Sequence, residues 1–221
     1  ILVIYQPNLQ SKEVEKNNFN HRYLYNYFSA LVSSNNQNND IALKHFNSSK
    51  HLLQTHENFL KNYVLALVEN NQLKKATNEI KKIQNKKNAK FFEASVLLIA
   101  DAINKNNFFK AKEYLIRLEN ISNNDTFEII IKETLSTYIN LFLEKKIYKT
   151  KSDFGRLNLI TESFQQCYLN NRESVKYFKA LLENEEKDYS RYLFFYFLNL
   201  IENEDFKTTK EISSKINTLN S

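Results

Sequence analysis

Three side chains near one another in the sequence could in principle bind a metal ion. His45, His51 and Glu57 supply imidazole and carboxylate groups, which are ordinary zinc ligands. However, none of the four histidines stands four residues from another, and no cysteine or carboxylate completes a known ligand spacing. We therefore expect His45 and His51 to be surface residues of a helix and its loop, and we expect no metal and no other cofactor.

The sequence also offers little for nucleophilic or acid–base catalysis. Cys167 is the one cysteine, and it stands on an apolar face of the predicted helix 157–169, where a packed thiol is the usual outcome. With a single glycine, Gly155, the chain can build neither a glycine-rich phosphate loop nor a glycine-flanked serine elbow. The carboxylates between Glu183 and Asp188 lie in a polar stretch typical of a solvated loop. The sequence therefore predicts a protein that is not an enzyme.

A run of lysines is the strongest electrostatic feature. The chain has 31 Lys+Arg against 25 Asp+Glu, a net charge of +6. Tyr63, Phe91 and Phe92 flank the run and offer rings on which bases could stack. An RNA-binding surface is thus one hypothesis, and an ordinary solvated helix face is the other. The candidate basic patch comprises Lys74, Lys75, Lys81, Lys82, Lys86, Lys87 and Lys90.

These side chains are expected to lie on helices. Leu60, Tyr63, Val64 and Leu67 follow the spacing of one helical face, and no segment alternates apolar and polar residues over the length of a strand. Clusters of Asn interrupt the helical segments, as at Asn70-Asn71 and Asn106-Asn107. Asn tolerates the left-handed conformation that ends many helices, so it can replace Gly there. The sequence predicts an all-α fold.

A small residue recurs at a nearly constant interval. Ala42, Ala76 and Ala111 are 34 and 35 residues apart, and Thr209 stands in an equivalent place near the end of the chain. Before each of them comes a segment with apolar residues at helical spacing, followed by a short polar loop. A period of this length is typical of stacked helix pairs, in which a short side chain lets two helices approach closely.

The repeat resembles the tetratricopeptide repeat family. Leu60, Tyr63, Val64 and Leu67 match the large residues of the family's first helix, and Ala76 with Ile80 matches its second helix. Similar sets recur at Ser95–Ala102 with Ala111, and at Leu193–Leu200 with Thr209. The resemblance implies a right-handed α-solenoid of antiparallel helix pairs over residues 19–221, after an extended or poorly ordered arm at 1–18. The expected units are about 19–54, 56–87, 89–121, 126–169, an irregular 172–184, and 188–218.

In this family the first helices line a concave groove that holds a peptide or a partner helix. The resemblance therefore implies a non-catalytic scaffold for a protein or peptide partner. The family's clamp for terminal carboxylates is not expected, because Leu65 and Leu97 stand where it needs Asn. The groove-facing set would be Asn58, Lys61, Asn62, Leu65, Val68, Glu69, Glu93, Val96, Leu97, Ala100, Ile103, Arg191, Phe194, Phe195, Leu198 and Ile201.

The compartment and the oligomeric state stay open at this point. The longest apolar stretch, Tyr192–Leu198, is too short for a membrane span, which needs about 20 residues. Because the sequence begins at Ile1 and contains no Met, we expect a fragment or a processed chain. A cytoplasmic location, or a periplasmic one if an export signal precedes residue 1, fits equally well.

Overall fold

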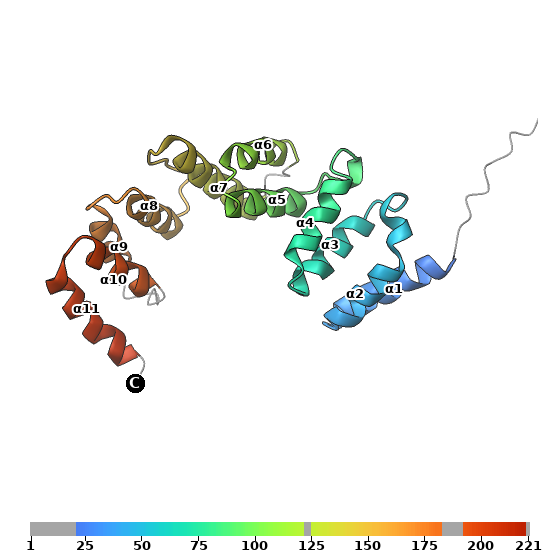
Figure 1. The fold of residues 1–221 in the computed structure, drawn as a ribbon, viewed down its shortest axis with the longest axis horizontal. Helices are drawn as coiled ribbons and strands as arrows, with labels where there is room; N and C mark the ends of the chain where they lie inside the picture. Colours follow the sequence, from blue (N-terminus) through green and yellow to red (C-terminus); the bar gives the residue numbers. More distant parts are fainter. Residues whose placement is uncertain (1–20, 122–124, 183–191, 220–221) are drawn as a thin grey trace, which may run out of the picture. The chain divides into compact units, whose positions relative to one another are not determined.

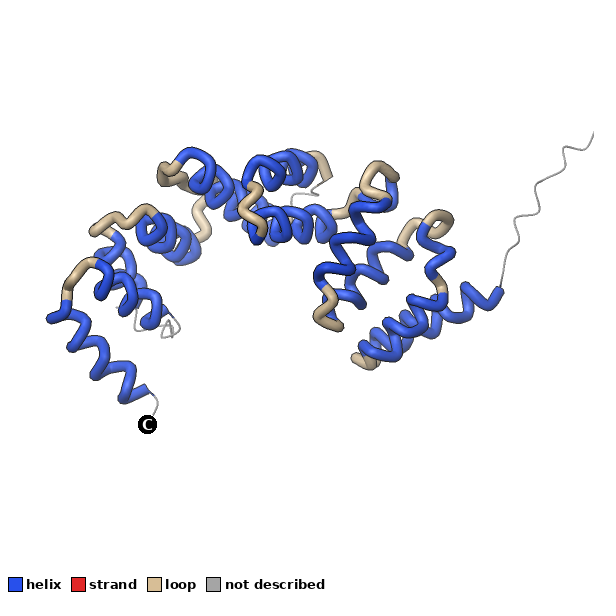
Figure 2. The backbone as a smooth tube through the Cα atoms, in the orientation of Figure 1, coloured by secondary structure: helices blue, strands red, loops and turns tan. Residues whose placement is uncertain are grey.

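A computed structural model describes residues 21–121, 125–182 and 192–219. Within these ranges the chain forms α-helices and short 3₁₀ turns and no strand, which confirms the all-α expectation (Figure 2). The expected arm at 1–18 lies outside the described residues. The helices are α1 (His21–Asn35), α2 (Asn39–Ser48), α3 (Phe59–Glu69), α4 (Leu73–Lys82), α5 (Phe92–Asn104), α6 (Phe108–Glu119), α7 (Thr126–Glu144), α8 (Arg156–Tyr168), α9 (Ser174–Leu182), α10 (Leu193–Glu202) and α11 (Phe206–Leu219).

The chain divides into two compact units, Ile1–Ala89 and Lys90–Ser221. The first contains α1 to α4 with the 3₁₀ turns η1 (Lys50–Leu53) and η2 (Lys87–Ala89). The second contains α5 to α11. In each unit helices that are adjacent in sequence pack against each other (Figure 1). The arrangement of these pairs into one right-handed solenoid stays a prediction.

Five connections between consecutive helices share one backbone turn. In each, a residue with φ between 52° and 59° donates its N–H to the carbonyl three residues before it. The N–H of the next residue donates to the carbonyl five residues before its own position. At the α3–α4 turn these bonds run from Asn71 to the Val68 carbonyl at 2.9 Å and from Gln72 to the Leu67 carbonyl at 2.8 Å. Such bonds satisfy the last carbonyls of a helix and reverse the chain. The left-handed residues are Gln37, Asn71, Asn106, Asn170 and Glu204.

The recurring small residues occupy equivalent places after these turns. Ala42, Ala76 and Ala111 each stand five residues after a left-handed residue, and all three are fully buried. Each therefore lies in the first turns of the second helix of a pair, against the helix before it. A larger side chain at this point would push the two helices apart.

Aromatic rings from three helices form the core of the first unit. Tyr27 of α1 lies 5.6 Å from Phe59 of α3, and Phe46 of α2 lies 5.8 Å from Phe59, both measured between ring centroids. Tyr63 of α3 completes the cluster, 6.3 Å from Phe46. Offset and edge-on ring pairs of this kind stabilise a core beyond the area they bury.

Hydrogen bonds between residues 35 positions apart also tie the first unit together. Asn62 Nδ2 donates to the Tyr27 hydroxyl at 2.9 Å, and Asn88 Nδ2 donates to the Leu53 carbonyl at 3.3 Å. The interval equals the repeat period of the sequence. Equivalent positions of successive helix pairs therefore lie side by side within this unit.

The helix pairing in the second unit differs from the expected grouping. The sequence predicts a unit 126–169, which would pair α7 with α8, and an irregular segment 172–184. In the structure α8 packs chiefly against α9, through the turn at Asn170, whereas α7 packs chiefly against α6. The connection lengths explain the difference, since α7 and α8 are joined by the long segment 145–155 and α8 and α9 by only 169–173.

Two helices of the second unit begin at residues whose chemistry explains the start. Asp125 caps α7, with its Oδ1 accepting a hydrogen bond from the Glu128 N–H at 2.8 Å, as the Asp-x-x-Glu spacing predicts. Gly155 precedes α8 with φ 60° and ψ −123°, a conformation that favours glycine. The single glycine of the chain therefore stands where the backbone turns into α8.

Candidate functional site

The outer face of α10 is an exposed apolar surface. Phe194, Phe195, Leu198 and Ile201 are 60%, 43%, 41% and 41% exposed. Their spacing along the helix places them on one side, while Tyr196 and Leu200 on the other side are buried. No charged residue interrupts α10 before Glu202, so this surface offers contact area and almost no charge.

Packing beneath α10 holds these rings in place. The ring of Phe195 lies 5.0 Å from Phe164 of α8 and 5.8 Å from Phe194. Tyr196 and Leu200 belong to a buried cluster with Phe178 of α9 and Ile212 of α11. The inner side of α10 therefore packs against α8, α9 and α11, which fixes the side that carries the exposed rings.

The predicted groove residues of α3 lie on the surface of the first unit. Leu65 is 51% exposed, and Asn58, Lys61 and Glu69 are also exposed. Val68 is half-buried, and half-buried Asn62 is occupied by its bond to Tyr27. The intervening residues of α3 form the core, as the helical spacing predicts.

The equivalent residues of the second unit have mixed exposure. On α5, Glu93 and Ala100 are exposed, while Val96, Leu97 and Ile103 are half-buried. Because α3 and α5 belong to different units, the continuity of one groove across them stays a prediction. Arg191 lies outside the described residues.

Three exposed residues of α1 were not identified from the sequence. Tyr25, Phe28 and Val32 are exposed and follow the i, i+3, i+7 spacing of one helix face, opposite buried Tyr27 and Ala30. The same spacing is visible in the sequence of His21–Asn35. The helix itself lies within the expected unit 19–54, but this face was not predicted, because the unit lacks a clear match to the first-helix pattern.

The lysine run is divided by the structure. Lys74, Lys75, Lys81 and Lys82 line a shallow hollow on α4, together with Asn78 and Glu79. Lys86 immediately precedes η2, and Lys87 is its first residue. The Lys87 Nζ lies 3.5 Å from Glu57 Oε1, so these two side chains form an ion pair. Lys90 begins the second unit, as do the neighbouring rings of Phe91 and Phe92.

The base-stacking part of the RNA hypothesis is wrong for Tyr63. Its side chain is fully buried, and its hydroxyl donates to Asn47 Oδ1 at 2.8 Å. The ammonium of Lys50 covers the ring, 5.3 Å from its centroid. Its helical spacing predicts that Tyr63 lies in the core with Leu60 and Leu67. Because the ring is buried there, no base can stack on it.

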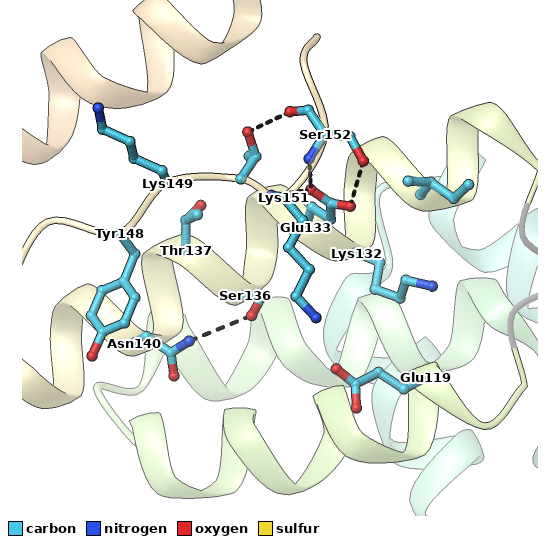
Figure 3. Close-up of a pocket in the computed structure, with 12 residues that line it drawn as sticks. Glu119, Lys132, Glu133, Ser136, Thr137, Asn140, Tyr148, Lys149, Lys151 and Ser152 are labelled. Carbon is cyan, nitrogen blue, oxygen red and sulfur yellow. Dashed lines mark hydrogen bonds between the residues drawn. The ribbon is translucent and has the colours of Figure 1, made fainter.

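A pocket of about 440 Å³ lies between α7 and the loop that follows it (Figure 3). Glu133 of α7 fixes this loop by accepting hydrogen bonds from the N–H groups of Lys151 and Ser152 at 2.7 and 2.9 Å, and from the Ser152 hydroxyl at 2.9 Å. Burial raises the pKa of Glu133, but the bonds from Ser152 and Lys151 outweigh it and lower the pKa below its ordinary value.

Buried Gln165 of α8 holds the other end of the loop. Its Oε1 accepts from the Tyr148 N–H and its Nε2 donates to the Tyr148 carbonyl, both at 2.8 Å. Neither Glu133 nor Gln165 stands out in the sequence, because each acts on backbone groups far along the chain. The pocket is mixed in charge, with Lys132, Lys149 and Lys151 set against Glu119 and Glu133.

The candidate metal ligands have other partners in the structure. His45 Nδ1 lies 3.2 Å from Asn26 Oδ1, and the ring of His51 lies 4.6 Å from that of Tyr23. Glu57 pairs with Lys87. Among the described residues no group of three or more His, Cys, Asp or Glu side chains is placed to hold a metal ion.

Cys167 is half-buried and hydrogen-bonded. Asn199 Nδ2 donates to its Sγ at 3.6 Å, and Ser174 Oγ donates to Asn199 Oδ1 at 2.6 Å. Burial raises the pKa of the Cys167 thiol, with a contribution from the charge of Glu202. The environment favours the protonated thiol, which is the less nucleophilic form.

Comparison with known proteins identifies no relative of this chain. No family model matches the sequence, and neither curated proteins nor solved structures give a match. The resemblance to tetratricopeptide repeats therefore depends on the residues quoted above. Across the ranges that the structure describes, no helix combines the length and the apolar character needed to span a membrane.

Proposed function

We propose that this chain is a non-catalytic interaction module that binds an apolar segment of another protein. The observation that carries the proposal is the exposed face of α10, where four large apolar side chains lie together without an intervening charge. A contiguous exposed apolar surface is costly in water and commonly marks an interaction site.

The chemistry of this face selects the partner. Phe194 and Phe195 supply rings, which serve as anchors in many interfaces. A partner segment with apolar residues at helical spacing, such as an amphipathic helix, would bury these rings and Leu198 together. The α3 face, with Leu65 between Lys61 and Glu69, adds a second and more polar surface in the first unit.

A peptide selection followed by substitution of exposed residues tests the proposal. A library of displayed random peptides would be selected for binding to the whole chain, and we expect the recovered peptides to carry apolar residues at i, i+3 or i+4. Their affinity should be about micromolar, near −8 kcal/mol, and Phe194→Lys should remove it. Leu65→Lys tests the α3 face of the first unit by itself, and should weaken only peptides that bind there.

Matched controls separate binding from folding. Phe109→Lys and Leu73→Lys change exposed apolar residues on α6 and α4, and should leave binding intact. Circular dichroism should be unchanged in all four variants. Peptide binding that survives Phe194→Lys combined with Leu198→Lys would contradict the proposal, as would self-association of the chain through α10 at the concentrations used.

A further inference from the structure

The positive charge of the chain is concentrated in the first unit. Residues 1–89 contain 12 Lys+Arg and 6 Asp+Glu, so this unit carries the whole net charge of +6. Residues 90–221 contain 19 of each and are neutral overall. An anionic macromolecule would therefore be attracted to the first unit rather than to the second.

Four lysines of that unit lie on one face of α4. Lys74, Lys75, Lys81 and Lys82 border the open hollow with Asn78 between them, and their spacing repeats every seven residues, or two helical turns. The opposite face of α4 is buried through Ala76, Thr77 and Ile80. Because that face is packed in the core, the lysine face of α4 is directed toward solvent.

The single carboxylate in the hollow is already neutralised. Glu79 is almost fully buried and lies 3.1 Å from Lys82 Nζ and 3.6 Å from Lys50 Nζ of η1. Lys50 thus adds a positive charge that compensates Glu79 from the neighbouring element. The remaining charge on this face is positive, so the hollow favours an anionic ligand.

From these features we infer that the α4 face, formed by Lys74, Lys75, Asn78, Lys81 and Lys82, binds the phosphodiester backbone of a single-stranded nucleic acid without reading its sequence. Lysine binds phosphate as a point charge, and Asn78 adds a hydrogen-bonding amide. The described residues of α4 expose no aromatic ring for base stacking. Affinity should therefore depend mainly on charge and be insensitive to base sequence.

The surroundings of the lysines disfavour a membrane surface as the ligand. A helix that lies on a bilayer inserts an apolar face, whereas the apolar face of α4 is used in the core of the unit. Leu73 is the one large apolar side chain that α4 exposes. The experiment must therefore distinguish binding to nucleic acid from binding to anionic lipid vesicles.

Fluorescence anisotropy with a labelled 16-nucleotide oligouridylate tests this inference. If four phosphates are neutralised, the slope of log K against log salt should be about −2.8, so that affinity falls about 50-fold between 50 and 200 mM salt. Lys74→Gln combined with Lys75→Gln should reduce the slope by about 1.4, and an oligothymidylate should bind equally well.

Charge-matched variants make the result specific to α4. Lys44→Gln combined with Lys112→Gln removes the same charge from exposed lysines of α2 and α6 and should leave the slope unchanged. Lys74→Arg combined with Lys75→Arg should retain binding. Absence of binding at 50 mM salt, an equal effect of the control pair, or binding only to vesicles with 30% phosphatidylserine would overturn the inference.

Discussion

Glu133 and Ser152 are joined by two hydrogen bonds, one from the serine N–H to Oε2 and one from its hydroxyl to Oε1, each 2.9 Å long. Together with the bond from the Lys151 N–H, they attach the loop 145–155 to α7. One carboxylate thus fixes the segment that directs the chain from α7 to α8. The relationship links residues 19 positions apart and has no local sequence signature.

The Glu133→Gln variant should destabilise the second unit by about 1–3 kcal/mol at pH 7, because one amide cannot accept all three bonds. Hydrogen exchange of the 146–153 amides should become faster in the same variant. Glu119→Gln changes an exposed carboxylate at the same pocket and should have little effect on either measurement. Equal behaviour of the two variants would contradict this role of Glu133.

The contribution of Glu133 should also depend on pH. Because the folded state lowers its pKa below the ordinary value of 4.5, folding favours the ionised form. The stabilisation is fully present above pH 4.5 and is lost as the pH falls through the lowered pKa. The difference in stability between the wild type and Glu133→Gln should therefore be constant from pH 7 to 5.5 and shrink below 4.5, as urea denaturation can measure.

The left-handed turn residues should differ in their response to glycine. Gln37 and Glu204 adopt positive φ at a steric cost that glycine lacks, so Gln37→Gly and Glu204→Gly should stabilise the chain by about 0.5–1 kcal/mol. Asn71 tolerates this conformation better, and Asn71→Gly should be nearly neutral. Denaturant midpoints would show the ranking, and an equal gain at all three sites would refute it.

The buried alanines should not accept larger side chains. Ala111 is fully buried between paired helices, and Ala111→Leu should destabilise the second unit by about 1–3 kcal/mol through overpacking. Exposed Ala100 of α5 provides a matched control, and Ala100→Leu should change the thermal midpoint little. A thermal midpoint equally low in both variants would argue against close packing at Ala111.

The thiol of Cys167 should react slowly in the folded chain. Burial both restricts access and raises its pKa, so alkylation by iodoacetamide at pH 7.5 should be at least about tenfold slower than in urea-unfolded protein. The reaction can be followed by intact mass. Similar rates in the folded and unfolded states would show that Cys167 is not protected by its packing against α10.

The helices and their ends follow from the sequence. The i, i+3, i+4 spacing of Leu60, Tyr63 and Val64 places these residues in the core, and Asn71 and Asn106 take the left-handed conformation at helix ends. These features depend on neighbouring residues only. A helical face and a helix cap are local properties, so their prediction needs no knowledge of the fold.

The pairing of the helices and the placement of the candidate surfaces depend on tertiary structure. The pairing of α8 with α9, and the attachment of 145–155 through Glu133 and Gln165, arise from contacts between distant residues. Lys90 belongs to a different unit from the lysines of α4, because the chain divides after residue 89. Periodicity shows which side of each helix is apolar, but only packing decides which of those sides are covered and which, like that of α10, stay exposed.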